Sequence, residues 1–215
     1  MMSFFYLHGW ASSPQSNKAR FFRQRFAEQG VDLHLPDLNQ EDFFHLTLTR
    51  QIHQVEALLP DDPVTMLGSS FGGLTALWLA QRQPQIKQLI LLAPALNFAT
   101  QSLALLTEEQ RHQWFMQKEL KIYHYGYERE MLLSYDFIED LQNYTDVGLR
   151  RCLPTLIFHG RHDEVIAVQS SRDFVHNHPW VQLVELDSDH SLANVHELMW
   201  EKIAQFCFNK SSEIS

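Results

Sequence analysis

The sequence predicts an α/β fold, built on a trimmed, mostly parallel sheet of six strands with helices on both faces. Two observations carry this prediction. Apolar segments of strand length recur at 3–7, 31–35, 63–68, 88–93, 154–160 and 180–186. Segments in which apolar residues recur at helical spacing lie between most of them, and this alternation favours right-handed crossovers between parallel strands.

The first strand and the first helix are clearly marked. Residues 3–7 are apolar and rich in aromatic side chains, and Gly9 ends the run after the length of a strand. Over 17–29 the apolar residues fall at helical spacing, and Gly30 supplies a stop at the C-terminal end. The chain therefore begins as a strand followed by a helix.

The same alternation repeats toward the C-terminus. The strand at 31–35 ends at Pro36, and a helical pattern over 43–59 ends at Pro60, which lacks the amide that a continuing helix needs. Further helical patterns, each next to one of the remaining strands, cover 72–83, 167–177 and 192–208.

The segment at about 95–150 is longer than one crossover requires. Two stretches in it, 106–123 and 128–144, have amphipathic helical patterns, and Thr107 is expected to cap the first. We expect a helical cap inserted into a single domain that spans residues 1–215. Five of the six tyrosines lie in this insertion. They suit an amphipathic or aromatic substrate, and they equally suit packing of the cap onto the sheet.

Composition and charge exclude several classes of function. With 17 Lys plus Arg against 26 Asp plus Glu, the formal charge is −9, and no basic run offers a face for nucleic acid. Two cysteines, Cys152 and Cys207, are too few for a disulfide framework. No apolar run approaches the roughly 20 residues that span a bilayer, and the apolar N-terminus lacks the basic region of a signal peptide. We therefore expect a cytoplasmic protein.

The first candidate catalytic residue is Ser70, in the GxSxG pattern of residues 68–72. This pattern directly follows an apolar strand and precedes a helix, which is the setting of a nucleophile elbow. In an elbow the serine occupies a strained turn above the sheet, where the helix N-terminus favours developing negative charge. A glycine-rich turn without chemistry is the alternative for this pattern taken alone.

A serine nucleophile needs a base, and the base needs an acid that orients it. Asp163 lies just beyond the strand at 154–160, and His190 lies just beyond the strand at 180–186. The carboxyl ends of parallel strands share one crevice, so these side chains can converge on the serine. The alternatives are Glu164 as the acid, Asp163 as a turn residue, and His190 as an ordinary loop histidine among twelve.

Two backbone amides are candidate oxyanion donors. A tight turn at Gly9 would aim the amide of Trp10 into the crevice, where it could act together with the amide of Phe71. The alternative is an ordinary glycine at the end of a strand. We interpret His8 as a residue that orients this turn and not as a base.

No metal or cofactor is expected, because the patterns HExxH, CxxC, GxGxxG and GK[ST] are absent from the sequence. His159 with His162 and Asp163, or His176 with His178, comes nearest to a ligand set. Paired histidines are commonplace in a chain that has twelve of them, so we assign no metal site.

The motifs resemble those of the α/β-hydrolases, and more closely those of the small YqiA/YcfP-like esterase family. The resemblance covers nearly the whole chain and rests on YLHGWASSPQSNKAR at 6–20, PDLN at 36–39, GSSFGG at 68–73, GRHDEV at 160–165 and DHSL at 189–192. It implies Ser70 as nucleophile, Asp163 as acid and His190 as base, with oxyanion amides from Trp10 and Phe71. The turn is HGW where lipases have HGGG, so the Trp10 side chain either narrows the acyl pocket or packs under the cap.

The sequence thus predicts a serine hydrolase that cleaves small carboxylic esters or thioesters through an acyl-enzyme intermediate. Two alternatives remain: a lyase or acyltransferase on the same fold, and a non-catalytic binding protein that keeps the elbow as structure. The acyl length, the leaving group, the oligomeric state and any motion of the cap stay open.

Overall fold

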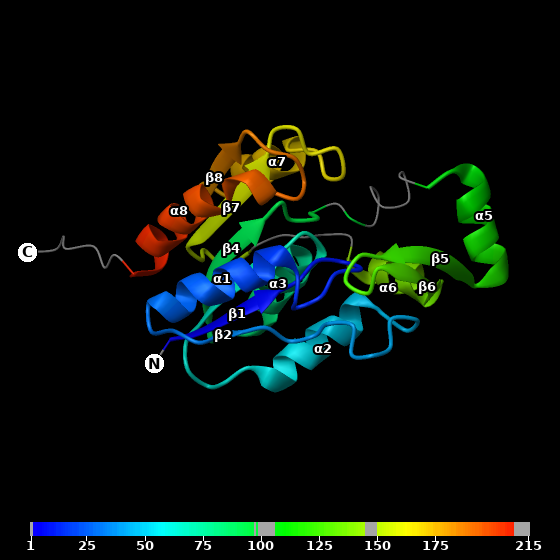
Figure 1. Ribbon diagram of the computed structural model, residues 1–215, viewed down its shortest axis with the longest axis horizontal. Coiled ribbons are helices and arrows are strands. Elements are labelled where there is room, and N and C mark those ends of the chain that lie inside the picture. The colour runs from blue at the N-terminus through cyan, green and yellow to red at the C-terminus, as the bar shows by residue number, and fades with distance from the viewer. Residues whose placement is uncertain (1, 97, 99–105, 145–149, 209–215) are drawn as a thin grey trace, which may run out of the picture.

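A computed structural model describes residues 2–96, 98, 106–144 and 150–208. Its main sheet has six strands in the order β2-β1-β3-β4-β7-β8, and every neighbouring pair is parallel. The predicted α/β fold is confirmed (Figure 1). The strands are β1 (Ser3–Leu7), β2 (Leu33–His34), β3 (Val64–Ser69), β4 (Ile86–Leu92), β7 (Thr155–Gly160) and β8 (Val181–Leu186).

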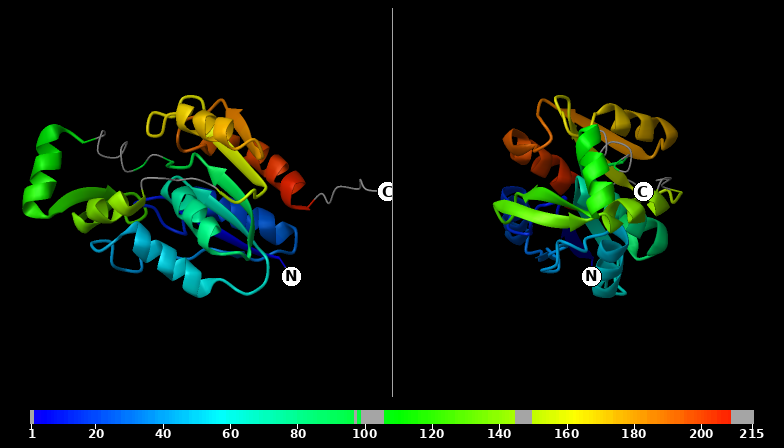
Figure 2. Two further views of the ribbon diagram at one scale, coloured as in Figure 1. Left: turned by 180° about the vertical axis from the view of Figure 1, so that it is seen from behind. Right: turned by 90° about the vertical axis from the view of Figure 1, so that its right-hand side faces the viewer.

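Helices cover both faces of this sheet (Figure 2). They include α1 (Asn17–Glu28), α2 (Leu48–Leu58), α3 (Phe71–Arg82), α7 (Gln169–Asn177) and α8 (His196–Phe208). On one face α1 and α8 contribute Phe22 and Trp200 to a buried cluster. On the other face α2 and α3 contribute Ile52 and Leu74 to a second cluster. No helix in the described part of the chain is both long and apolar enough to cross a membrane.

Local capping sets where the first two helices begin. The Ser16 hydroxyl accepts a hydrogen bond from the amide of Ala19, and the Thr47 hydroxyl accepts one from the amide of Arg50. The cap at Thr47 explains why α2 begins at Leu48 and not at residue 43 as the apolar pattern predicted. The predicted strand at 31–35 is also shorter, because this edge strand pairs with β1 through only two residues.

Residues 106–144, which we call the cap segment, differ from the two long helices predicted for them. The segment contains α5 (Glu108–Gln117), β5 (Glu119–His124), β6 (Arg129–Ser134), α6 (Asp136–Leu141) and a 3-10 turn, η1 (Gln142–Tyr144). Thr107 caps α5 as expected and forms a capping box with Gln110. Lys118 then takes a left-handed conformation with φ 60°, which ends α5. The residues that follow pair as an antiparallel hairpin, β5–β6.

The cap segment lies beyond the carboxyl ends of the main strands (Figure 1). Hydrogen bonds join it to the core: the Ser134 amide donates to the carbonyl of Phe44, the Gly126 amide donates to the carbonyl of Ala11, and the amide and hydroxyl of Thr49 donate to the Asp140 carboxylate. The contact with Thr49 places the Asp140 carboxylate at the N-terminus of α2. There it accepts a hydrogen bond from a backbone amide that has no partner within the helix.

Candidate active site

The turn between β3 and α3 holds Ser70 in a strained backbone conformation, with φ 52° and ψ −116°. Glycines on either side allow this turn. A Cβ on Gly68 would lie 2.4 Å from the carbonyl oxygen of Gly72, and a Cβ on Gly72 would lie 2.2 Å from that of Leu7. The strand and the helix thus approach closely only because neither glycine carries a side chain. The local geometry is that of the predicted elbow.

The structure brings the three predicted side chains into direct contact. His190 Nε2 lies 3.1 Å from Ser70 Oγ, and His190 Nδ1 lies 2.7 Å from Asp163 Oδ2. The side chain of Asp163 is fully buried, whereas that of His190 is 25 % exposed. A continuous hydrogen-bonded path therefore runs from a buried carboxylate, through a partly exposed imidazole, to the hydroxyl at the elbow.

Two loops converge to make these contacts, one after β7 and one after β8. Gly160 at the end of β7 packs against the second loop, because a Cβ there would lie 2.4 Å from the carbonyl oxygen of Ser188. The amides of Arg161 and His162 donate to the carbonyls of Leu186 and Ser188. The loops are therefore fastened to each other through their backbones.

Two backbone amides and two histidine rings surround the carboxylate of Asp163. Its Oδ1 accepts from the amides of Val165 (2.9 Å) and Ile166 (2.7 Å), and its Oδ2 lies within reach of both His190 and His159 (3.2 Å). Burial alone would raise the pKa of this carboxyl group, but the hydrogen bonds from His159 and His190 outweigh burial and lower the pKa below its usual range. The group is a carboxylate at neutral pH. Glu164, the alternative acid, is exposed.

The turn at Gly9 lies against the elbow. A Cβ on Gly9 would be 3.4 Å from both the carbonyl oxygen of Ser69 and the Cβ of Ser70, so Gly9 packs directly against the nucleophile, and Trp10 is the next residue of the chain. The second predicted donor, the amide of Phe71, belongs to the first residue of α3. Phe71 thus follows Ser70 in the sequence, whereas Trp10 follows a glycine that contacts Ser70 in space.

Two side chains complete this turn. His8 is buried, its Nδ1 donates to the carbonyl of Gly9 (2.9 Å), and its Nε2 accepts from the amide of Leu38 (3.0 Å). His8 therefore links the turn to the loop after β2 and has no contact with Ser70, as the sequence suggested. The ring of Trp10 stacks on Phe137 of the cap segment, with centroids 6.2 Å apart. Of the two expectations for Trp10, packing under the cap is the one observed.

Two further residues contact the site, and neither contact was predicted from the sequence. Lys18 of α1 donates from Nζ to the hydroxyl of Ser69 (3.0 Å), directly before the nucleophile. Burial lowers the pKa of Lys18 to about 8, and the charges of Asp163 and Asp189 oppose that shift. His159 was weighed only as a metal ligand, yet it contacts the carboxylate of Asp163. The sequence carries no signal for this contact, because it depends on how the chain turns after Gly160.

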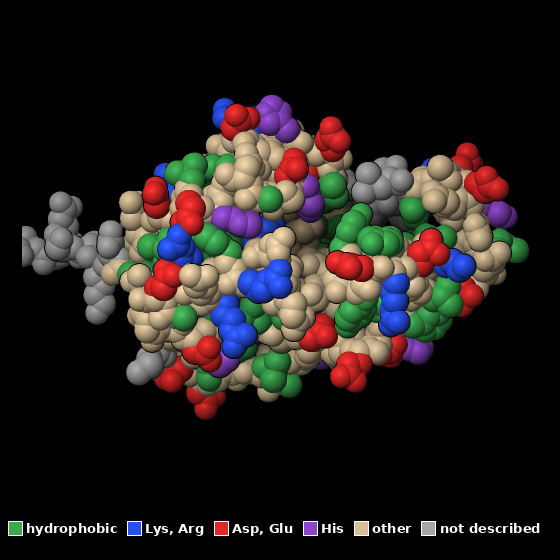
Figure 3. All heavy atoms as spheres, viewed as in Figure 1, with side chains coloured by type: hydrophobic (Ala, Val, Ile, Leu, Met, Phe, Trp, Pro, Cys, Tyr) green, Lys and Arg blue, Asp and Glu red, His purple; other side chains and the backbone are tan. Residues whose placement is uncertain are grey.

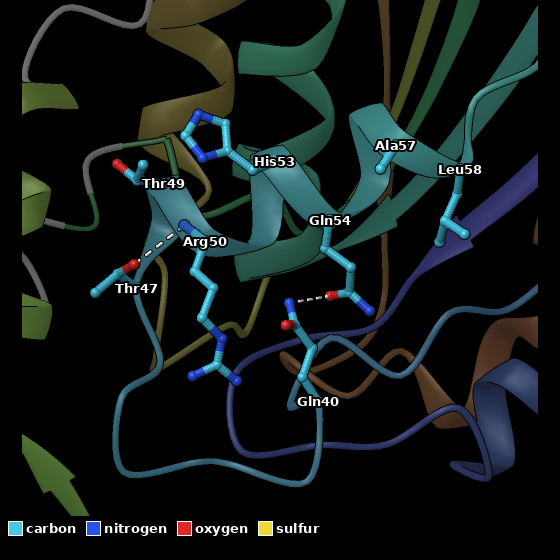
Figure 4. A pocket seen from close by; sticks show the side chains of 8 residues that line it. All are labelled: Gln40, Thr47, Thr49, Arg50, His53, Gln54, Ala57 and Leu58. Atoms are coloured by element: carbon cyan, nitrogen blue, oxygen red, sulfur yellow. Dashed lines mark hydrogen bonds between the residues drawn. The ribbon is translucent and has the colours of Figure 1, made fainter.

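The molecular surface has two hollows in this part of the protein. Figure 3 shows a hollow between the core and the cap segment with a histidine at its edge, and apolar side chains gathered over the β5–β6 hairpin. A second, open hollow lies over α2 (Figure 4). There Arg50 and Gln54 point to one side of the helix, while Thr49 and His53 point to the other. These polar groups do not converge on one point, and none of them belongs to the Ser70 site.

The fold these elements form is the α/β-hydrolase fold, as the solved structures similar to this chain show. Est1E from Butyrivibrio proteoclasticus, in a structure with ferulic acid bound, has 21 % identity and a TM-score of 0.79, covering 96 % of this chain and 88 % of that chain. Mouse alpha/beta hydrolase domain-containing protein 10 has 22 % identity and a TM-score of 0.75, covering 94 % and 88 %. A pyrethroid hydrolase from Sphingobium faniae JZ-2 has 20 % identity and a TM-score of 0.63, covering 96 % and 97 %.

Within this fold class the chain belongs to UPF0227, an uncharacterised protein family whose model matches residues 3–207. No curated protein sequence matches the chain. Membership of the family and likeness to the solved structures define the fold, and the chemistry has to be argued from the side chains around Ser70.

Proposed function

We propose that this protein is a serine hydrolase that cleaves carboxylic esters or thioesters through an acyl-enzyme intermediate. One observation carries the proposal: the hydrogen-bonded path from Asp163 through His190 to Ser70, which ends at a strained elbow. A serine hydroxyl is a weak nucleophile unless a base takes its proton, and this arrangement provides a base at hydrogen-bond distance.

In the first half-reaction Ser70 Oγ attacks the carbonyl carbon of the substrate while His190 Nε2 takes the hydroxyl proton. The carbonyl oxygen becomes an oxyanion, and the amides of Trp10 and Phe71 are its proposed hydrogen-bond donors. The tetrahedral intermediate then breaks its bond to the alcohol or thiol, and His190 returns the proton to this leaving group. In the second half-reaction His190 takes a proton from water, whose oxygen attacks the acyl carbon. The bond to Ser70 Oγ then breaks, His190 returns the proton to Ser70, and the acid is released.

Asp163 keeps the imidazole of His190 in the tautomer that these reaction steps require. As a carboxylate it accepts from His190 Nδ1–H, which leaves Nε2 with a lone pair facing Ser70. It also stabilises the imidazolium that forms during attack, without itself becoming protonated. The hydrogen bonds that hold its pKa low therefore support the proposed role.

Aromatic side chains support an apolar acyl group as part of the substrate. Phe71 packs against Phe98 with centroids 4.9 Å apart, and Trp10 packs against Phe98 and Phe137. These rings lie beside both proposed oxyanion amides, so the acyl side of the site is apolar. The ferulic acid held by Est1E is an aromatic acid on the same fold, which agrees with this proposal.

A fluorophosphonate probe tests the proposal, because it phosphonylates an activated serine with loss of fluoride. We expect one adduct by intact mass on the wild-type protein and none on Ser70→Ala, followed by turnover of p-nitrophenyl esters from acetate to palmitate. A Ser69→Ala variant is the matched control, and it should still label. If the folded wild-type protein forms no adduct, the proposed hydrolase is wrong, and a lyase or a binding protein gains weight.

A further inference from the structure

A second histidine touches the carboxylate of Asp163. His159, the last residue but one of β7, is completely buried, and its Nε2 lies 3.2 Å from Asp163 Oδ2. His190 Nδ1 lies 2.7 Å from the same oxygen. Two imidazole rings, one buried and one partly exposed, therefore share a single carboxylate oxygen. The proposed mechanism uses only the ring of His190.

The remaining contacts of His159 fix which nitrogen carries its proton. Nε2 also lies 2.8 Å from the carbonyl oxygen of Ile166, which can only accept a hydrogen bond. Nε2 must therefore bear a hydrogen, which donates to that carbonyl while Nε2 itself lies 3.2 Å from Asp163 Oδ2. Nδ1 lies 2.8 Å from the hydroxyl of buried Ser171, which can donate to it. A neutral ring with its hydrogen on Nε2 satisfies every contact.

We propose that His159 is a positioning residue for the serine hydrolase reaction: it fixes the carboxylate of Asp163 and limits how strongly that carboxylate holds the His190 imidazolium. The proposal rests on the proposed function. A carboxylate oxygen that already accepts one N–H has less negative charge to offer a second. With His159 in place, His190 can therefore release its proton to the leaving group more readily than it could beside an unshared oxygen.

Other charged groups also face this cluster and remain unchanged in the experiment below. Asp189 precedes His190 in the loop after β8, and its carboxylate accepts from Ser191. Lys18 of α1 carries a positive charge that interacts with Asp163 and Asp189. Glu185 of β8 lies opposite His159 in the sheet and is paired with Arg172 of α7. Variants confined to His159 therefore isolate its contact with Asp163.

Replacing His159 by Gln or by Asn distinguishes its contact with Asp163 from the packing of its side chain, because the two amide side chains differ in length. In His159→Gln the amide nitrogen can occupy the position of Nε2 and still donate to Asp163. In His159→Asn the shorter side chain reaches only the position of Nδ1, beside Ser171. We expect the pKa of His190 to rise by about half a unit to one unit in His159→Asn. In His159→Gln it should stay within about 0.2 units of the wild-type value.

The measurement is a titration of His190 by NMR in protein with ¹⁵N-labelled histidine, without substrate. The acid limb of the pH dependence of kcat/KM should move by the same amount, so kcat/KM on that limb should fall by about threefold to tenfold in His159→Asn only. Ser170→Ala serves as a control on the same helix as Ser171, because its hydroxyl donates to the carbonyl of Ala167, and the pKa of His190 in this variant should match the wild-type value. Equal pKa values of His190 in the folded Gln and Asn variants would overturn the proposal.

The wild-type protein provides a test that does not depend on whether the variants fold. The ¹⁵N shifts of His159 must correspond to a ring protonated at Nε2, and a ring protonated only at Nδ1 would overturn the proposal. Because these spectra need no turnover, the two proposals fail separately. Absence of the fluorophosphonate adduct counts against the hydrolase, whereas a wild-type protein that labels but has the wrong tautomer counts against His159.

Discussion

The carboxyl edge of the main sheet and the cap segment are held together in different ways. All six residues of β3 and all six of β7 are buried, and their loops are fastened by backbone hydrogen bonds. In the hairpin of the cap segment, β5 and β6 each bury only two of six residues. The elements that carry Ser70 and Asp163 are therefore among the most tightly packed parts of the molecule, while the neighbouring hairpin is largely exposed.

The difference in burial matches the positional precision that each region needs. A hydrogen-bonded relay works only if its members keep their distances to within a fraction of an ångström, and packed strands provide that. A hairpin that buries few side chains opens at a lower free energy than the core, so it can change shape or sequence without disturbing the relay. The predictions below use this contrast, from the largest expected effect to the smallest.

Asp163→Asn should lower kcat/KM by about 10⁴-fold, because the amide favours the wrong tautomer of His190 while leaving the loop in place. Glu164→Gln is the matched control, since Glu164 is exposed and adjacent, and we expect its activity to stay within about twofold. Steady-state kinetics on a p-nitrophenyl ester checks both. A large loss in Glu164→Gln with a small one in Asp163→Asn would move the acid to Glu164.

Gly72→Ala should lower the free energy of unfolding by about 3 kcal/mol, because the new Cβ would lie 2.2 Å from the carbonyl oxygen of Leu7. The comparison is Gly30→Ala, where φ is 71° but nothing lies within 4 Å of a Cβ. Only backbone strain acts there, so the expected cost is about 1 kcal/mol. Urea denaturation of both variants tests this order, and equal losses would contradict it.

The cap hairpin should loosen as the pH falls, because of His124. This side chain is buried against Phe43, and its Nε2 has no hydrogen-bond partner among the described residues. Burial lowers the pKa of His124 to about 4, whereas in an opened hairpin it would be about 6.5. The stabilisation is therefore complete above pH 6.5 and is lost as the pH drops toward 4, by about 2 kcal/mol at pH 5.

Hydrogen exchange of the β5 and β6 amides at pH 7 and pH 5, corrected for the intrinsic rates, measures this loss. His124→Phe keeps an aromatic ring against Phe43 but cannot bind a proton, so its hairpin stability should be nearly independent of pH in this range. A pH dependence that survives in His124→Phe would assign the effect to another group.

Tyr123→Ala should have the smallest effect. Its side chain is 49 % exposed on the hairpin, so we expect a change in unfolding free energy within about 0.5 kcal/mol and an unchanged preference for acyl chain length. Trp114→Ala is the contrasting variant, because that side chain is buried and its Nε1 donates to the carbonyl of Leu133. A chain-length profile that shifts in Tyr123→Ala would show that exposed tyrosines of the cap take part in selecting the substrate.

The same contrast explains what could be predicted from the sequence. The strands of the core are buried on both faces, so their apolar runs stand out, and the order of Ser70, Asp163 and His190 follows from strand ends that share one edge. In the cap segment too few side chains are buried for the apolar residues to show a clear helical or strand periodicity. Leu120, Ile122 and His124 alternate as in a strand, but Leu120 and Ile122 also fit the helical pattern predicted for 106–123, and only Lys118 at φ 60° separates the helix from the strand.

The contact between His159 and Asp163 could not be derived for a related reason. A buried histidine in an apolar strand looks the same in sequence whether it meets a hydroxyl, a carbonyl or a carboxylate. Which of these it meets depends on how the chain turns after Gly160, and that turn is set by the loop after β8, about 28 residues away in sequence. Lys18 is similar, because its partner Ser69 belongs to another strand end.

The approach of Gly72 to the carbonyl of Leu7 links the reactive serine to the order in which the chain is assembled. The elbow gains its final shape only when the first strand of the chain lies beside the third and the helix after it has docked on both. A chain that has collapsed but not yet seated its N-terminal strand would therefore carry Ser70 in an unstrained turn, away from His190. Under the proposed function, incompletely folded copies are chemically silent, and the appearance of a probe-reactive serine during refolding reports that the sheet is complete.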